Sequence, residues 1–307
     1  MIIFLLKTVV KSTPYFSDDV LKYLIPTSVT IFVFTLGLLT AWVKANIERR
    51  RQYQQLRSLF ITWIPNFERP VIAYAANCDD FSARLNTSER LSSESMALIP
   101  LNVDKLASID INQMVKTFIY NTTGDPQQNN EQLYYMVSNL EYLVNLGPEM
   151  EAKYNEHYIS TNNLLKEWNA AFIELSDLQL KVFKNQTDKS EARLTMEKQL
   201  RTNIINWTAQ NQDNPQNTVV TYNHLLVPNL KSLNSYFQQT KSEEQVVVDL
   251  TAALHRVTIT YRQWRASHEG YAIVFINYGD KLRNCYERLQ ASIDYFELNT
   301  KINLICT

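Results

Sequence analysis

Apolar residues follow one another without a single charge from Tyr23 to Val43, close to the start of the chain. As a helix, this segment reaches roughly 30 Å, which is the thickness of a bilayer's hydrocarbon core. Tyr23 and Trp42 stand at its two ends, where interfacial aromatic side chains are typical. The pattern predicts a transmembrane helix at 23–43 surrounded by the lipid bilayer. A buried helix of a soluble protein and a cleaved signal peptide fit less well, because the run is long and starts beyond residue 20.

Basic residues are more numerous after this segment than before it. Those that follow it are Lys44, Arg49, Arg50, Arg51 and Arg57, and those that precede it are Lys7, Lys11 and Lys22. Because positive charge is retained on the cytoplasmic side, we expect a single-pass protein with its N-terminus outside and its C-terminal domain in the cytoplasm. The same basic cluster sets the topology and can attract anionic lipid headgroups, at about 1 kcal/mol per charge.

The first 22 residues are apolar at their start but too short to span a bilayer. We expect the segment 1–22 to lie along the membrane interface, with a contact to a partner protein as the alternative. Ser17, followed by Asp18 and Asp19, is typical of a helix N-terminus.

After the span, apolar residues recur at steps of three and four, and no helix breaker occurs before Pro65. This predicts that the spanning helix continues as a stalk at 44–64. A membrane-proximal helical region is expected at 65–125, ending at the breaker sequence Asn-Thr-Thr-Gly-Asp-Pro. The remainder, 126–307, is predicted to form a bundle of long antiparallel helices.

Within that bundle, apolar stripes mark the individual helices. The first ends at Gly147-Pro148, and the second has a seam close to a heptad, which is typical of a coiled coil. Its residues are Met150, Tyr154, Tyr158, Thr161, Leu165, Trp168, Phe172 and Leu175. Further stripes lie at 194–207, 230–237, 247–261 and 282–296, and the segment 271–276 fits either a strand or the start of a helix. The fold class is therefore all-α.

Composition narrows the classes of function. Five glycines in 307 residues argue against folds that need tight turns or a close backbone approach to phosphate. A net charge of −1 gives no indication of nucleic-acid binding. The three cysteines do not suggest a disulfide scaffold, and they agree with a reducing compartment.

Motifs of catalysis are absent from the sequence. It contains no Walker A, dinucleotide-binding, nucleophile-elbow or zinc-protease motif. None of the four histidines follows a glutamate by three positions, and no C-x-x-C pair occurs. The sequence therefore predicts no metal site and no cofactor, and it identifies no small-molecule ligand.

One short pattern points to an enzyme. Arg262 and His268 frame the sequence Arg-Gln-Trp-Arg-Ala-Ser-His, which resembles the R-x-x-x-x-x-H motif of the all-helical HEPN ribonucleases. Gln263 stands where that family has Asn, Asp or His. The resemblance covers seven residues and implies metal-independent RNA cleavage, with Arg262 and His268 as the catalytic residues.

Three functions follow from these patterns. The leading one is a membrane-anchored, cytoplasm-facing interaction or scaffold protein, which holds a protein partner or a second copy of itself at the membrane. One alternative is a signalling sensor that passes a ligand signal through the span. The other alternative is a membrane-tethered, HEPN-like ribonuclease.

Overall fold

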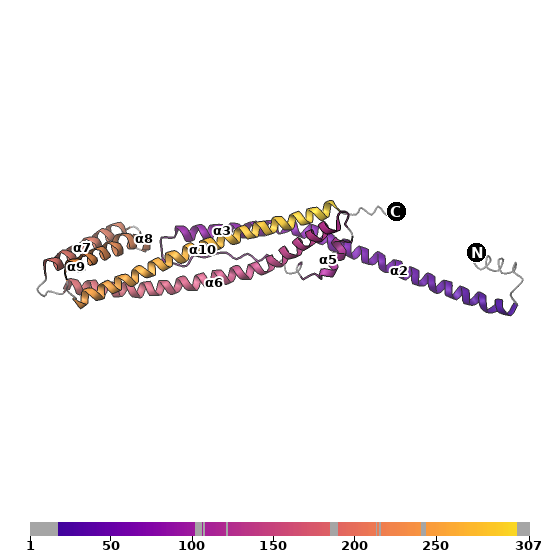
Figure 1. The fold of residues 1–307 in the computed structure, drawn as a ribbon, viewed down its shortest axis with the longest axis horizontal. Coiled ribbons are helices and arrows are strands. Elements are labelled where there is room, and N and C mark those ends of the chain that lie inside the picture. The colour runs from indigo at the N-terminus through magenta and orange to yellow at the C-terminus, as the bar shows by residue number, and fades with distance from the viewer. Residues whose placement is uncertain are drawn as a thin grey trace. The chain divides into compact units, whose positions relative to one another are not determined.

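A computed structural model describes residues 18–299, apart from 102–105, 107, 121, 185–189, 213, 215 and 241–243, with side chains from Pro26 onward. The described residues form helices and contain no strand. The helices are α2 (Asp18–Asn66), α3 (Glu68–Thr87), α5 (Ile111–Phe118), α6 (Pro126–Lys184), α7 (Glu191–Gln210), α8 (Thr218–Thr221), the π-helix η1 (Tyr222–Leu226), α9 (Val227–Gln239) and α10 (Gln245–Leu298) (Figure 1). The predicted all-α class, with a long apolar N-terminal helix and a helical bundle, is confirmed.

The chain divides into two units, each built from separate segments. The N-terminal unit comprises residues 1–63, 109–133 and 296–307, and the main unit comprises residues 64–108 and 134–295. Each unit is thus discontinuous in sequence, and the predicted segment boundaries stay predictions. The predicted interfacial segment lies mostly outside the described residues, as does the Tyr23 side chain.

Helix α2 runs without a break through the predicted span and stalk. Pro26 lies in its third turn, and the next proline is Pro65, at its end. Because no helix breaker intervenes, the backbone hydrogen bonds continue from one predicted segment into the next. The helix ends at Asn66, two residues beyond the predicted end at Ile64.

Helix α6 corrects one prediction. The sequence places a helix end at Gly147-Pro148, yet α6 continues through Pro148 to Lys184. Proline inside a helix costs about 3 kcal/mol, because it removes one backbone hydrogen bond. Leu146 and Met150, on either side of it, are fully buried, so tertiary packing outweighs that cost.

Helix α10 corrects a second prediction, since the two helices expected at 247–261 and 282–296 are one helix, which includes the ambiguous segment 271–276. Its buried residues recur every seven positions within the main unit. They are Val247, Leu254, Tyr261, His268, Phe275, Leu282 and Leu289. Buried residues at every seventh position keep one face of a long helix against its neighbours. This pattern therefore accounts for the length of α10 as a single helix.

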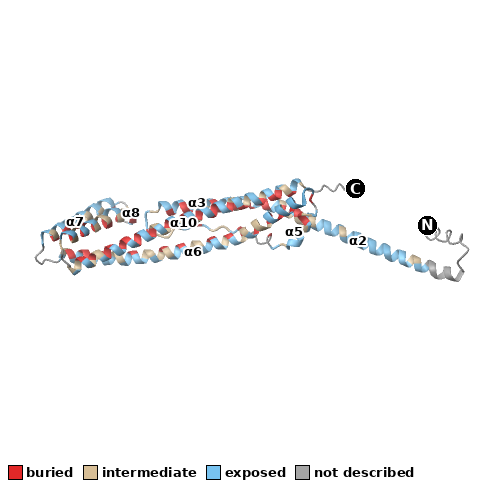
Figure 2. Ribbon diagram, in the orientation of Figure 1, coloured by how far each residue is buried: buried red, intermediate tan, exposed pale blue. Residues whose placement is uncertain are grey.

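Helices α3, α6 and α10 run side by side in the main unit (Figure 1), and aromatic side chains pack between them. The ring of Phe81 in α3 meets His157 of α6 at 5.7 Å and Phe275 of α10 at 4.8 Å, both edge-on. Burial follows the inner faces of these helices, as Figure 2 shows. Tyr158, expected in the seam of α6, is 46% exposed, and the adjacent His157 takes the buried position.

Helices α3 and α10 approach each other closely at Gly279. A Cβ atom built on this glycine would lie 2.9 Å from Oδ1 of Asp79 and 3.2 Å from the carbonyl oxygen of Ala75. Both distances are shorter than ordinary van der Waals contact. Glycine therefore allows this close packing, and any side chain here would require its neighbours to shift.

Candidate functional site

The segment of α2 from Pro26 to Val43 is apolar and exposed along its length (Figure 2). Its most apolar window has a mean hydropathy of 1.6, and none of that window is buried by the protein. Phe34 is 66% exposed and Trp42 is 65% exposed. This helix is long and apolar enough to cross a membrane.

Threonine hydroxyls in this segment bond to the helix's own backbone. Thr30 donates to the carbonyl of Pro26 at 2.8 Å, and Thr35 donates to that of Ile31 at 2.8 Å. Thr40 donates to the carbonyl of Leu36. These hydroxyls can therefore face lipid without an unsatisfied donor.

The basic residues after the span do not all behave alike. Lys44, Arg49, Arg50 and Arg51 are exposed, as headgroup contact requires. Arg57 departs from that expectation, because its side chain is only 6% exposed and packs inside the N-terminal unit. Its charge still counts in the topology argument, which stays a prediction.

Arg57 joins three segments of the N-terminal unit. Its Nη2 donates to the carbonyl of Phe296, in the last turn of α10, and its Nη1 donates to the Thr122 hydroxyl at 3.4 Å. The guanidinium also lies 6.0 Å from the ring centroid of Phe118. Burial lowers the pKa of Arg57, an effect that Glu297 opposes. A cation at the carboxyl end of a helix is favourable, so this residue serves the fold.

A buried histidine pair lies between α6 and α10 of the main unit. The ring centroids of His157 and His268 are 5.1 Å apart, and neither residue is exposed. Trp264 packs on His268 at 4.8 Å, and Tyr271 packs on His157 at 4.8 Å. Nε2 of His157 and both ring nitrogens of His268 lack a partner of ordinary hydrogen-bond geometry in the described part of the chain.

These surroundings keep both imidazoles neutral. Burial lowers the pKa of His157 to about 4. Burial also lowers the pKa of His268 to about 4, with further lowering by His157 and Arg265 and an opposing effect from the backbone of Leu85. An apolar site disfavours the imidazolium, because its charge loses water without gaining an acidic partner.

The structure does not bring Arg262 and His268 into one accessible site. Arg262 is exposed, and its Nε donates to the hydroxyl of Tyr222 at 3.1 Å. His268 is fully buried, and six residues along α10 it lies about 120° around the helix from Arg262. An RNA phosphate that contacts this arginine would not reach the imidazole, so the geometry gives no support to the ribonuclease interpretation.

The described cysteines are not nucleophiles. Cys78 and Cys285 are free and buried, and burial raises the pKa of each thiol to about 12. A thiol with that pKa stays protonated near neutral pH. No group of three or more His, Cys, Asp or Glu that could hold a metal ion occurs among the residues with described positions.

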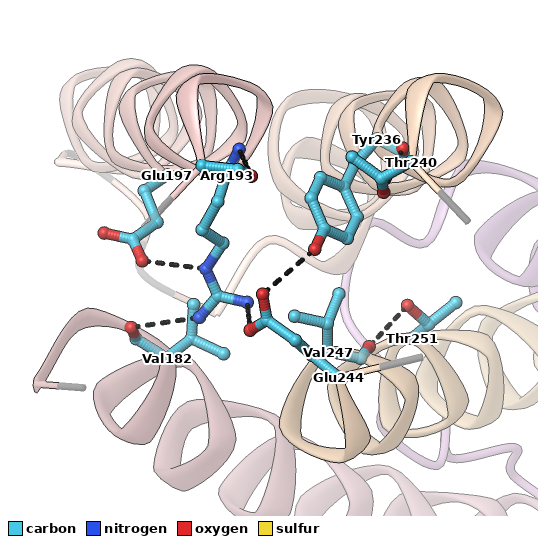
Figure 3. Close-up of polar contacts among 9 residues, drawn as sticks. Val182, Arg193, Glu197, Tyr236, Thr240, Glu244, Val247 and Thr251 are labelled. Atoms are coloured by element: carbon cyan, nitrogen blue, oxygen red, sulfur yellow. Dashed lines mark hydrogen bonds and ion pairs between the residues drawn. The ribbon is translucent and has the colours of Figure 1, made fainter. Parts of the chain in front are cut away.

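A buried ion-pair network is centred on Arg193, at the start of α7 (Figure 3). Its guanidinium donates to Glu197 at 3.0 Å, to Glu244 at 2.9 Å and to the carbonyl of Val182 at 3.3 Å. The hydroxyl of Tyr236 in α9 donates to the second oxygen of Glu244 at 3.2 Å. One cation thus joins the end of α6, the start of α7 and the residue before α10, and through Tyr236 it also reaches α9.

The sequence analysis predicted neither the pair of His157 and His268 nor the ion-pair network of Arg193. Arg193 and Glu197 are four residues apart in a helix, a spacing that signals an ion pair. Glu244 is distant in sequence and gave no signal. For His157, the seven-residue recurrence of α6 was the usable signal, because position 157 follows the buried Met150 by seven.

Comparison with known proteins adds no relative to this description. No family model, no curated protein and no solved structure matches the chain.

Proposed function

We propose that the chain is a membrane-anchored helical interaction protein, with one helix in the bilayer and a bundle that holds a protein partner or a second copy at the membrane. The single observation that carries the proposal is the bare apolar surface of α2 between Pro26 and Val43. Soluble proteins rarely leave so large a contiguous apolar surface in water. A bilayer covers it without any change in the helix.

The transition from apolar to basic residues supports this role. Lys44 and the arginine triplet 49–51 are exposed immediately after the apolar segment, at the level where lipid headgroups would lie. Their charge supports the proposed orientation, with the C-terminal domain in the cytoplasm.

Large exposed apolar side chains on the main unit support an interaction role. They lie on α6, α7 and α10. Among them are Ile159, Ile173, Leu180, Leu194, Ile205, Ile259 and Ile273. The buried histidines and thiols described above offer no catalytic group to a substrate in solution.

Alkaline carbonate extraction of membranes tests the anchor. We expect the full chain to stay with the membrane, whereas F34K/L38K places two charges in the span at about 3 kcal/mol each and releases the protein. The matched control, I159K/I205K, adds the same charges to exposed positions of the main unit and stays with the membrane. Release of the unaltered chain, or retention of F34K/L38K, would contradict the anchor.

Reporters fused after Thr307 test the orientation. A fluorescent protein that folds in the cytoplasm should be bright, and alkaline phosphatase, which needs an oxidising compartment, should be inactive. The opposite pair of results would reverse the topology. A chain that is monomeric in detergent and that captures no partner would contradict the interaction role.

A further inference from the structure

The face of α10 opposite its buried face carries a second seven-residue series. It consists of Ala252, Ile259, Ala266 and Ile273, all of which are exposed. Ile259 is 50% exposed and Ile273 is 62% exposed. At about 100° per residue, Ile259, Ala266 and Ile273 lie within about 40° of one another and roughly opposite the buried His268. We call Ile259, Ala266 and Ile273 the outer seam.

The outer seam is symmetric about Ala266. Ile259 precedes this alanine by seven residues, and Ile273 follows it by seven. A two-fold axis through Ala266, perpendicular to α10, would therefore place each Ile259 against Ile273 of a second copy. The two Ala266 residues would meet at the axis, where their small side chains allow the helices to approach closely. Such a self-complementary patch is what a two-fold interface requires.

Charge on one flank of the seam obeys the same symmetry. Arg262 precedes Ala266 by four residues and Glu269 follows it by three, on the same side of the helix. The two-fold axis therefore places Arg262 of each copy beside Glu269 of the other copy. Bonds to Tyr222 and Arg265, respectively, already orient these two side chains. A parallel pairing, with the two-fold axis along the helices, would instead place the charged flanks of the two copies on opposite sides of the contact, so these charges would not meet.

We propose that the outer seam docks a second copy of this chain, in an antiparallel contact between two α10 helices centred on Ala266. The proposal rests on the interaction role proposed above and deepens it by naming the partner. The apolar contact is small, with two isoleucines from each copy, so the affinity in solution is modest. Confinement to a membrane raises the effective concentration of the second copy and compensates for this.

Cysteine crosslinking in membranes tests the axis. The background chain carries C306S, and its Cys78 and Cys285 are buried. A residue on a two-fold axis meets its own copy, so A266C should form a disulfide-linked dimer under mild oxidation. A252C is the matched control, because the same axis places its two copies about 40 Å apart, far beyond the reach of about 7 Å between Cα atoms.

A mixed experiment fixes the direction of the contact. Chains carrying I259C and chains carrying I273C should crosslink to each other, whereas neither should crosslink to itself. Self-crosslinking of I259C would indicate a parallel pair and overturn the proposal. So would a crosslink of A252C as strong as that of A266C, or no crosslink of A266C.

Energetic coupling provides the second readout. I259K should lower the A266C crosslink by about ten-fold or more, since it puts a charge against an apolar partner. I205K, on an isoleucine of α7 that is 67% exposed, should leave the crosslink unchanged. R262E should weaken the crosslink and R262E/E269R should restore it. Carbonate extraction of the same samples reads membrane attachment separately, so failure of the anchor and failure of the docking surface are distinguishable.

Discussion

The guanidinium of Arg193 and the imidazoles of His157 and His268 are buried in the same unit, yet their surroundings are opposite. Arg193 has two carboxylates and a carbonyl within hydrogen-bond distance. The histidines have aromatic rings around them and unpartnered nitrogens within the described structure. A permanent cation can be buried only with its partners, whereas a histidine can be buried by giving up its proton.

The largest expected effect is acid destabilisation through the histidine pair. Unfolded histidines bind protons near pH 6.5, whereas folded His157 and His268 do so only near pH 4. The contribution of the histidine pair to the free energy of unfolding is therefore constant above about pH 6.5. It falls as the pH drops toward 4, by about 3 kcal/mol for each histidine. Urea unfolding in detergent, followed by circular dichroism across this range, measures the slope.

The double variant H157L/H268L isolates this contribution from that of the carboxylates. Its free energy of unfolding should depend much less on pH between 6.5 and 4. H255L changes an exposed histidine of α10 and should keep the full dependence of the free energy of unfolding on pH. An unchanged slope in H157L/H268L would mean that the pair is not buried in its neutral form.

The next effect in size is the loss of Arg193. R193M removes the buried guanidinium that bonds to the carboxylates of Glu197 and Glu244, so the free energy of unfolding should fall by about 3–5 kcal/mol. The same urea titration at neutral pH checks this value. R256M is the matched control, since Arg256 and Glu174 form an exposed pair that contributes less than about 1 kcal/mol.

A second substitution sharpens this comparison. R193M/E197L removes both charges and should recover most of the lost stability, because apolar pairs of similar volume replace buried ion pairs at little cost. If R193M costs no more than R256M, the network does not stabilise the fold.

The smallest effect is expected at His268 alone, at neutral pH. H268L has a similar volume and removes two buried ring nitrogens, whose contact with the backbone of Leu85 falls outside ordinary hydrogen-bond geometry, so we expect a gain of about 1 kcal/mol. Urea midpoints of H268L and of the unaltered chain give the difference. A loss of 2 kcal/mol or more would show that these nitrogens have partners.

The sequence predicts the helical class because its apolar positions recur at helical steps throughout. It predicts helix ends less well, since local breakers compete with burial. At Pro148 the local cost is real, but the buried neighbours Leu146 and Met150 outweigh it. The segment 271–276 is ambiguous by itself, and only its continuity with buried positions on both sides makes it helical.

For the polar groups too, the sequence predicts some contacts and not others. The pair of Arg193 and Glu197 follows from helical spacing, but Glu244 joins them only through the fold. His268 and Arg262 form a recognisable pattern in the sequence, and the structure separates them because they lie on different faces of one helix. A sequence motif specifies only the spacing of residues along the chain, whereas the residues of one site must also lie on the same face of the helix.

The missing side chain at Gly279 selects one alignment of α3 against α10. A seven-residue recurrence is degenerate, because sliding one helix by a full repeat again opposes apolar positions. Such a slide would bring the side chain of Ala272 or Tyr286 to the place where a Cβ atom would lie 2.9 Å from Oδ1 of Asp79 and 3.2 Å from the Ala75 carbonyl oxygen. The absence of a side chain at Gly279 therefore favours the observed alignment of these two helices over one shifted by a full repeat.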